Sequence, residues 1–366
     1  MKELILHVGA AKCGSTTIQT LLKKASSKKA NTCFHYQKLN TQLINGLRLS
    51  KPEALRTCQG HLNTIQNKQK LVISHEYLQE QYKALANIIQ LAKEFDYKFI
   101  QIIGYTRRQD SWRRANFNQW SFRNKYSLIQ AKTLLSKLGC DWRLFSAYER
   151  WLLLGFFEQE GPNWALHYQH YKSCLSQQDI AHNVVSRPIP CQKEKPSKLL
   201  HHFNKHCNTN IKAKLINACT AIKNPSFSEY LTETIADSIL LTPSSLSQPI
   251  TPHKNNKDLA EISHNLDKQL PAFNMEFLET LEKNYLSIFS DSNKRYCDEF
   301  NLCFDTHFKP NPAHFNMNSE TMKTYVRSEN KRRLNHIETI LQFKIEQQAK
   351  CTQAILQQLT EADPTT

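Results

Sequence analysis

The beginning of the chain runs from an apolar segment into a glycine-containing turn and then into a helical stretch. Residues 4–8 are apolar, Gly9 and Gly14 lie at the two ends of the turn, and residues 17–24 have helical character. An apolar run this short is typical of a buried strand in a parallel sheet. The order strand, turn, helix therefore favours folds built by alternating these elements.

The same order recurs further along the chain. Apolar runs at residues 71–73, 99–105 and 184–186 predict three more buried strands, each followed by polar residues, and residues 81–95 carry apolar side chains at helical spacing. Strands that alternate with helices predict a parallel sheet with helices on both faces. The expected fold class is α/β: a P-loop-type three-layer α/β/α domain with a central parallel sheet, plus a helical C-terminal extension.

The predicted domain boundary lies near residue 310. Residues 1–310 are expected to form the α/β domain, with a surface loop at 241–256 and helical structure at 265–304. Residues 311–366 are expected to form the helical extension. Its apolar residues mark an amphipathic helix at Leu334, Ile337, Leu341, Ile345, Ile355 and Leu359. The sequence leaves open whether this helix packs on its own domain or forms a homodimer contact.

Composition and cysteine usage favour a cytoplasmic location. Hydrophobic residues make up 40% of the 366 residues, and no apolar run approaches the roughly 20 residues of a membrane-spanning helix. The amino-terminal apolar run is too short for a signal peptide. The eleven cysteines include no Cys-x-x-Cys pair, which is typical of reduced thiols in a reducing compartment. No metal site is predicted, because the group at 201–207 has no second set of ligands: His201, His202, His206 and Cys207.

The chain is strongly basic. It has 48 Lys and Arg against 32 Asp and Glu, for a formal net charge of +16. Such an excess promotes association with nucleotides, nucleic acids, acidic glycans or membrane surfaces, and it also occurs as a solvated basic surface. Charge alone does not choose between these, and no recognition motif for nucleic acid is present, so no specific nucleic-acid partner is predicted.

The turn after the first strand has the properties of a phosphate-binding loop. Gly9 and Gly14 permit a tight turn and a close approach of the backbone to a ligand. A helix that begins after the turn offers unpaired N–H groups and a favourable dipole to an anion. Lys12 adds a positive charge, and hydroxyl groups follow at Ser15, Thr16 and Thr17. The segment differs from a Walker A loop, because Lys12 precedes Gly14 by two residues, which disfavours magnesium-dependent ATP chemistry.

Residues 7–19 resemble the 5′-phosphosulfate loop of the sulfotransferase superfamily that uses 3′-phosphoadenosine 5′-phosphosulfate (PAPS). The bacterial branch typically reads His-hydrophobic-Gly-x-x-Lys-Thr-Gly-Thr-Thr-x-hydrophobic-Gln, and here Cys13 and Ser15 replace two of the threonines. The resemblance covers roughly residues 1 to 310, sparsely in the middle. It implies PAPS as the cofactor. The residues implied to bind it in this loop are Gly9, Lys12, Cys13, Gly14, Ser15, Thr16 and Thr17.

A second segment resembles the 3′-phosphate element of the same superfamily, in which an Arg at a strand end is followed by a Ser eight positions later. Arg107 matches the Arg, and an Arg fork suits a phosphate monoester because it donates two parallel hydrogen bonds. Ala115 occupies the Ser position, so one expected hydroxyl donor is missing. Neighbouring residues that can compensate are Arg108, Ser111 and Asn116. A basic helix start at the surface is the alternative interpretation.

A third segment, residues 74–76, resembles the Ser-x-Glu element of bacterial sulfotransferases and follows the strand that carries the catalytic base in the superfamily. His75 titrates near neutrality and is one candidate for the base. Glu76 is the other, and we favour it slightly because the bacterial motif retains the acid. The alternative is structural: His75 caps the strand end and Glu76 pairs with a lysine.

Together these resemblances imply an enzyme that moves a sulfuryl group from PAPS to an acceptor hydroxyl or amine and releases 3′-phosphoadenosine 5′-phosphate (PAP). Lys12, His75 and Glu76 are its implied catalytic residues. Because bacterial relatives often act on carbohydrates or glycolipids, a glycan or glycolipid is the expected acceptor. Two alternatives stay open: a P-loop nucleotide-dependent phosphotransferase such as a kinase, and a non-catalytic basic protein that binds PAP or another anion on the same scaffold.

Overall fold

The computed structural model describes residues 1–27, 33–65, 69–189, 197–219, 227, 229–241, 275–308 and 317–361. The chain forms two compact units. The first unit consists of Met1–Arg108, Asn163–Lys223 and Asp291–Phe308. The second unit consists of Gln109–Pro162, Asn224–Ser290 and Lys309–Thr366. The predicted boundary near residue 310 lies outside the described residues, and the two units have other bounds than the predicted domains.

A five-stranded parallel sheet lies at the centre of the first unit, with strand order β2-β3-β1-β4-β5. Its strands are β1 (Lys2–Val8), β2 (Phe34–Lys38), β3 (Lys70–His75), β4 (Tyr97–Thr106) and β5 (Ala181–Pro188). The interior strands β1, β3 and β4 are mostly buried, as expected for parallel strands with helices on both faces. The predicted α/β fold class, with its central parallel sheet and helical C-terminal region, is confirmed.

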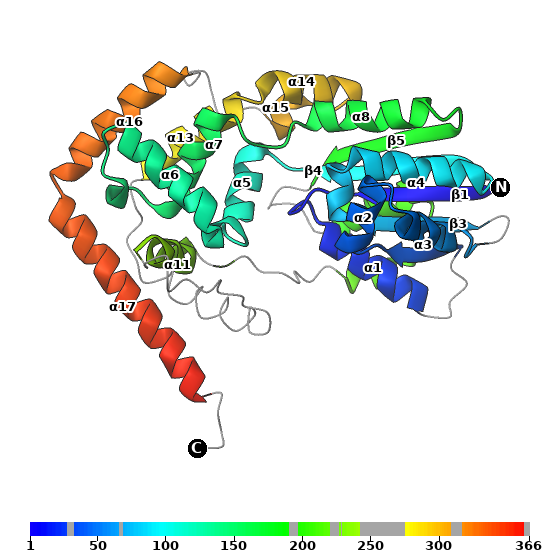
Figure 1. Cartoon of the computed structure of the whole chain (residues 1–366), viewed down its shortest axis with the longest axis horizontal. Helices are drawn as coiled ribbons and strands as arrows, with labels where there is room; N and C mark the ends of the chain where they lie inside the picture. Colours follow the sequence, from blue (N-terminus) through cyan, green and yellow to red (C-terminus); the bar gives the residue numbers. More distant parts are fainter. Residues whose placement is uncertain are drawn as a thin grey trace. The chain divides into compact units, whose positions relative to one another are not determined.

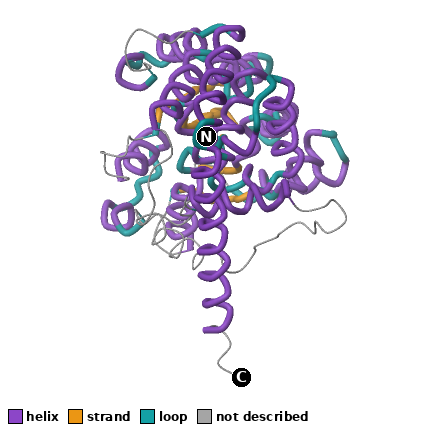
Figure 2. The backbone as a smooth tube through the Cα atoms, turned by 90° about the vertical axis from the view of Figure 1, so that its left-hand side faces the viewer, coloured by secondary structure: helices purple, strands orange, loops and turns teal. Residues whose placement is uncertain are grey.

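Helices cover both faces of this sheet. Two sets pack among themselves, one formed by α2, α3, α4 and α8 and the other by α1, α9 and α10. Figure 1 shows α4 and α1 on opposite sides of β1 and β3, and Figure 2 shows the strands with helices on either side. The bounds are α1 (Ser15–Ser27), α2 (Thr41–Arg48), α3 (Pro52–Leu62), α4 (Tyr82–Glu94), α8 (Trp164–Ser176), α9 (Ser197–Cys207) and α10 (Ala213–Asn217). The short helix η1 (Glu76–Gln79) follows β3, and α14 (Ser290–Glu299) and α15 (Phe304–His307) come last in the chain order of this unit.

The four predicted strands are present, and β2 is one that the sequence analysis missed. It has the sequence Phe-His-Tyr-Gln-Lys and lies at the edge of the sheet, where only Phe34 is fully buried. An edge strand with one face open to water needs no apolar run, so its hydrophobic signal is weak.

The described part of the second unit is helical. Its helices are α5 (Gln109–Phe117), α6 (Lys125–Lys137), α7 (Ala147–Glu158), α11 (Glu229–Leu241), α13 (Met275–Ser287), α16 (Ser319–Leu334) and α17 (Ile337–Glu361), with short 3₁₀ helices at Ser121–Arg123 and Trp142–Leu144. Helix α7 is buried on all sides from Ala147 to Phe156 and forms the centre of the hydrophobic core. Most of its side chains are apolar, and its two buried charged residues, Glu149 and Arg150, are paired with residues of other helices.

The C-terminal segment differs from the single amphipathic helix that the sequence predicted. The chain leaves the helix after Leu334, where α16 ends, and α17 begins at Ile337. Ile345, one of the apolar residues that marked the predicted helix, is 60% exposed. Of the predicted loop at 241–256 only Leu241 is described, and it ends α11. No helix among the described residues is both long and apolar enough to cross a membrane.

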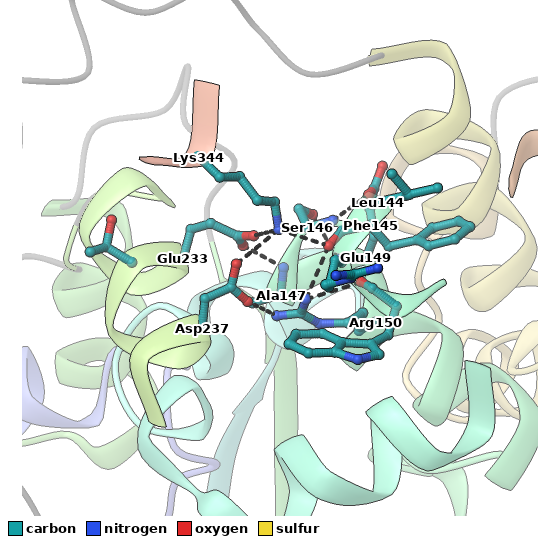
Figure 3. A network of polar contacts seen from close by, with 12 residues as sticks. Leu144, Phe145, Ser146, Ala147, Glu149, Arg150, Glu233, Asp237 and Lys344 are labelled. Carbon is teal, nitrogen blue, oxygen red and sulfur yellow. Dashed lines mark hydrogen bonds and ion pairs between the residues drawn. The ribbon is translucent and has the colours of Figure 1, made fainter. Parts of the chain in front are cut away.

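Buried ion pairs join the C-terminal helices to the rest of the second unit. Arg333 on α16 binds both carboxylate oxygens of Glu149 on α7, at 2.8 Å each. Lys344 on α17 contacts Glu233 at 3.1 Å and Asp237 at 2.8 Å, and both acids lie on α11 (Figure 3). Asp237 also pairs with Arg150 of α7. These contacts pack the C-terminal helices on their own unit, which was one of the two alternatives, and the homodimer contact stays a prediction.

Candidate phosphate-loop and base site

The loops that follow β1, β3 and β4 meet at one edge of the sheet. Val8 at the end of β1 is paired in register with His75 at the end of β3. On its other side β1 pairs with β4, with His7 opposite Ile103. Because all three strands run in parallel, their carboxyl ends lie at the same edge, where ligands bind in sheets of this kind. The three predicted motifs therefore begin at neighbouring strand ends.

The loop between β1 and α1 has the backbone form of an anion-binding nest. Lys12 and Gly14 both adopt left-handed backbone conformations, with φ of 66° and 82°. The N–H of Cys13 bonds to the carbonyl of Ala10 at 3.1 Å, and the N–H of Thr17 bonds to that of Gly14 at 3.1 Å. Alternating right- and left-handed residues turn successive N–H groups toward one side, and the first turn of α1 carries no acidic residue. The loop is thus suited to an anion such as a phosphate or sulfate.

Both glycines of this loop are required by their surroundings. A Cβ atom at Gly14 would lie 2.4 Å from Cδ2 of Leu199 on α9, and the left-handed backbone there also favours glycine. A Cβ atom at Gly9 would lie 2.0 Å from Oγ of Ser15. The loop can therefore pack against α9 and against Ser15 only because these two positions lack side chains.

Two of the residues implied to bind the cofactor have buried side chains. Ser15 is almost fully buried, and its hydroxyl donates to the carbonyl of Ala10 at 3.2 Å. Cys13 is fully buried, and burial raises the pKa of its thiol to about 12, so it is a neutral thiol at physiological pH. The side chains at these two positions are therefore not available to a ligand, and the N–H of Cys13 already donates to the carbonyl of Ala10. Thr16 and Thr17 are partly exposed at the start of α1.

Arg107 lies against the phosphate loop. Its Nη1 donates to the main-chain carbonyl of Lys12 at 3.4 Å, and its own carbonyl accepts from Nε1 of Trp164 at 3.0 Å. Ala115, the other position of the predicted 3′-phosphate element, is on α5 and belongs to the second unit. Arg107 belongs to the first unit, and the part that Ala115 plays in the 3′-phosphate element stays a prediction.

His75 serves as a cap at the end of β3. Its Nδ1 accepts a hydrogen bond from the N–H of Tyr77 at 3.0 Å, where the helix η1 begins. The ring is 7% exposed and stacks on the Tyr77 ring with 5.5 Å between centroids. Burial, with a smaller effect of Lys38, lowers the pKa of His75 to about 4. A neutral imidazole of low pKa with Nδ1 already engaged is a weak base, which favours Glu76 for that role.

Glu76 is half-buried next to two lysines. Burial raises the pKa of its carboxyl, while the charges of Lys12 and Lys38 act in the opposite direction. Lys12 belongs to the phosphate loop, and Lys38 ends β2, where it pairs in register with Ser74. A carboxyl whose pKa is raised above its usual value is a stronger base, and the two lysine charges favour its ionised form.

Lys38 is the site residue that sequence reasoning missed. It is exposed at the carboxyl end of β2, and its charge acts on both His75 and Glu76. Prediction of β2 would have indicated Lys38, because β2 pairs with β3 and the residue that ends β2 therefore lies near the end of β3. The polar sequence of β2 concealed that strand.

The predicted absence of a metal site is not contradicted. His201, His202, His206 and Cys207 all lie on α9, and His202 bonds through Nδ1 to the hydroxyl of Tyr105 at 3.0 Å. Across the described ranges no group of three or more His, Cys, Asp or Glu side chains is arranged to hold a metal ion.

Comparisons with known proteins give no match to this chain, whether among family models, curated proteins or solved structures.

Proposed function

We propose that the chain is a sulfotransferase that moves a sulfuryl group from PAPS to an acceptor hydroxyl or amine. The observation that carries the proposal is that the phosphate loop and the segment of Glu76 follow paired strand ends, Val8 beside His75, where the charge of Lys12 acts on the Glu76 carboxyl. The position of Arg107 against the same loop adds a second cation. The resemblance of residues 7–19 and 74–76 to the superfamily's motifs supports the 5′-phosphosulfate as the anion.

In the proposed reaction the acceptor oxygen attacks the sulfur of PAPS in line with the bond to the leaving phosphate. The new bond joins the acceptor oxygen to sulfur, and the bond between sulfur and the bridging oxygen breaks, so that PAP leaves. Glu76 takes the acceptor proton. Lys12 and the N–H groups of the loop stabilise the negative charge that develops on the bridging and terminal oxygens. A positioned base of this kind typically contributes about 10²–10⁴-fold in rate.

Residues next to the candidate base suit a sugar as the acceptor. Tyr77 follows Glu76 directly and is 54% exposed, and aromatic rings are suitable surfaces for the apolar face of a sugar. The exposed ammonium of Lys38 and the net charge of +16 suit an acidic glycan. A glycan or glycolipid acceptor, a cytoplasmic location and a homodimer through the C-terminal helix stay predictions.

Thermal unfolding with and without PAP tests the cofactor, and magnesium–ATP is the comparison ligand. At about 100 times its dissociation constant, a ligand that binds only the folded state adds roughly 2.7 kcal/mol to the free energy of unfolding. We expect PAP to raise the midpoint and magnesium–ATP to leave it unchanged. A preference for magnesium–ATP would favour the phosphotransferase alternative, and no shift with either ligand would remove the basis for a PAPS site.

A further inference from the structure

A buried polar chain joins the three elements on which the proposed site is built. His7, in β1, contacts Oγ of Ser74 through Nδ1 at 2.7 Å. Gln19, in α1, donates from Nε2 to the same oxygen at 3.3 Å. His7 and Ser74 are fully buried, and Gln19 is nearly so. Ser74 is two residues before Glu76 in β3, and Gln19 is on the helix that begins at the phosphate loop.

The hydrogen bonds of Ser74 bear on the tautomer of His7. The amide of Gln19 donates to Ser74, and the hydroxyl proton of Ser74 is available to Nδ1 of His7. Burial lowers the pKa of His7 to about 3, so the ring is neutral, and we take the arrangement in which Ser74 donates to Nδ1 and the one ring proton is on Nε2. Among the described residues this Nε2 has no hydrogen-bond partner. A buried donor without a partner is costly and rare in folded proteins.

The His7 ring lies directly against the start of the phosphate loop. A Cβ atom at Gly9 would be 3.3 Å from Cε1 of His7, the ring carbon between the two nitrogens. The other neighbours of the ring are aromatic: Tyr105 and Phe203, with centroids 6.2 Å and 5.7 Å away. These rings supply no strong acceptor, so the Nε2 proton is buried beneath the loop in apolar surroundings.

We propose that His7, Ser74 and Gln19 are positioning residues that couple occupancy of the phosphate loop to the placement of the base Glu76. Ligand binding at Gly9 to Gly14 moves the loop backbone relative to the His7 ring, and the unmatched Nε2–H responds to that movement. Through Ser74 the same contact orients the end of β3. The inference rests on the proposed function, because it takes the 5′-phosphate group as the ligand of the loop.

Ligand discrimination provides the first part of the test. PAP carries the 5′-phosphate that the loop is proposed to bind, and adenosine 3′-phosphate lacks it. We expect Ser74→Ala to weaken PAP binding by about tenfold, as for the loss of one buried hydrogen bond, and to leave binding of adenosine 3′-phosphate unchanged. Equal weakening of both ligands would mean that Ser74 only supports the fold.

Ser186→Ala is the matched control. Ser186 is a buried serine of β5 in the same unit, and its hydroxyl is also 2.7 Å from its partner, the hydroxyl of Tyr296. The substitution and the length of the bond are the same as for Ser74, but the hydrogen bonds of the Tyr296 hydroxyl are to Ser186 and Thr106 and not to the loop. We expect it to keep the preference for PAP over adenosine 3′-phosphate. A loss of preference equal to that of Ser74→Ala would overturn the assignment of a special role to Ser74.

Nitrogen-15 NMR of the histidine rings measures the state of His7 in the unmodified protein. The only variant needed is His7→Gln, whose missing signals identify the His7 resonances. We expect PAP, but not adenosine 3′-phosphate, to shift the His7 Nε2 resonance, and the free protein to show the Nε2–H tautomer. If PAP binds and this resonance stays in place, the inference falls and the proposed function stands. If PAP does not bind, both fall together.

Discussion

The guanidinium group of Arg107 donates a hydrogen bond to the main-chain carbonyl of Lys12, with 3.4 Å between Nη1 and the oxygen. This contact connects the end of β4 to the phosphate loop and holds a cation against the left-handed turn at Lys12. It gives Arg107 two effects on an anion in the loop: it fixes the loop backbone, and it contributes charge.

Arg107→Ala is therefore expected to weaken PAP binding. A hydrogen bond to a charged group contributes about 1.5–3 kcal/mol, which corresponds to a loss of roughly tenfold or more in the binding constant. Calorimetric titration with PAP measures this. Arg48→Ala, at an exposed arginine in the last turn of α2, is the control and should bind PAP like the unchanged protein. Equal affinities for the two variants would show that Arg107 has no part in the site.

Substitutions at the end of β3 separate the two candidate bases. Glu76→Gln removes the proton acceptor and should lower the rate of sulfuryl transfer by about 10²–10⁴-fold while PAP still binds. His75→Asn keeps an acceptor for the N–H of Tyr77, since Asn is a good cap, and should lower the rate far less. Single-turnover rates with saturating PAPS measure both. A larger loss for His75→Asn would reverse the assignment.

Lys38 is expected to set the pH range in which Glu76 is ionised. Burial raises the carboxyl pKa, and the positive charge of Lys38 opposes this, so Lys38→Met should raise the pKa further. Because transfer needs the ionised base, the limb of the pH–rate profile on the acidic side should move to higher pH. Lys38→Arg keeps the charge and should leave that limb in place. An unchanged profile for Lys38→Met would show that Lys38 does not act on the base.

Neighbouring arginines of α16 allow a test of the buried ion pairs in the second unit. The side chain of Arg333 is 4% exposed and binds Glu149, which is also buried, whereas that of Arg332 is 52% exposed. Arg333→Met leaves a buried carboxylate without its partner and should lower the free energy of unfolding by about 3–5 kcal/mol. Arg332→Met should cost about 0–1 kcal/mol.

Urea unfolding followed by circular dichroism measures these two changes. Adding Glu149→Gln to Arg333→Met removes the unpaired charge and should recover part of the loss. If Arg332→Met and Arg333→Met lowered the free energy of unfolding by similar amounts, burial of the arginine would not determine how much these ion pairs contribute to stability.

Sequence patterns predicted the parts of the fold that depend on local signals. The runs that became β1, β3 and β4 are apolar because those strands are buried between two layers of helices. The strand β2 has one open face and lacks that signal, so Lys38 was missed along with it. The break between α16 and α17 was also missed, since the apolar spacing continues across Asn335 and His336.

Residue types at the candidate site indicated the chemistry but not the direction of the side chains. Lys12, Gly14 and Glu76 are brought to one edge of the sheet, as the order of strands and motifs implied. The roles of the Ser15 hydroxyl and the His75 imidazole could not be predicted from residue type alone, because both side chains form hydrogen bonds with neighbouring backbone groups. The division into two units depends on contacts between distant segments, which no local pattern contains.

The most direct test of the sulfotransferase proposal is the release of PAP from PAPS in the presence of a panel of acidic and neutral glycans. Two substitutions at one position provide the comparison. Lys12→Ala removes the cation, and Lys12→Gly removes it while also suiting the left-handed backbone there, so the second variant should be at least as stable as the unchanged protein. We expect acceptor-dependent PAP release by the unchanged protein and none by either variant. Acceptor-dependent release at equal rates by all three proteins, or none by the unchanged protein with any glycan, would contradict it.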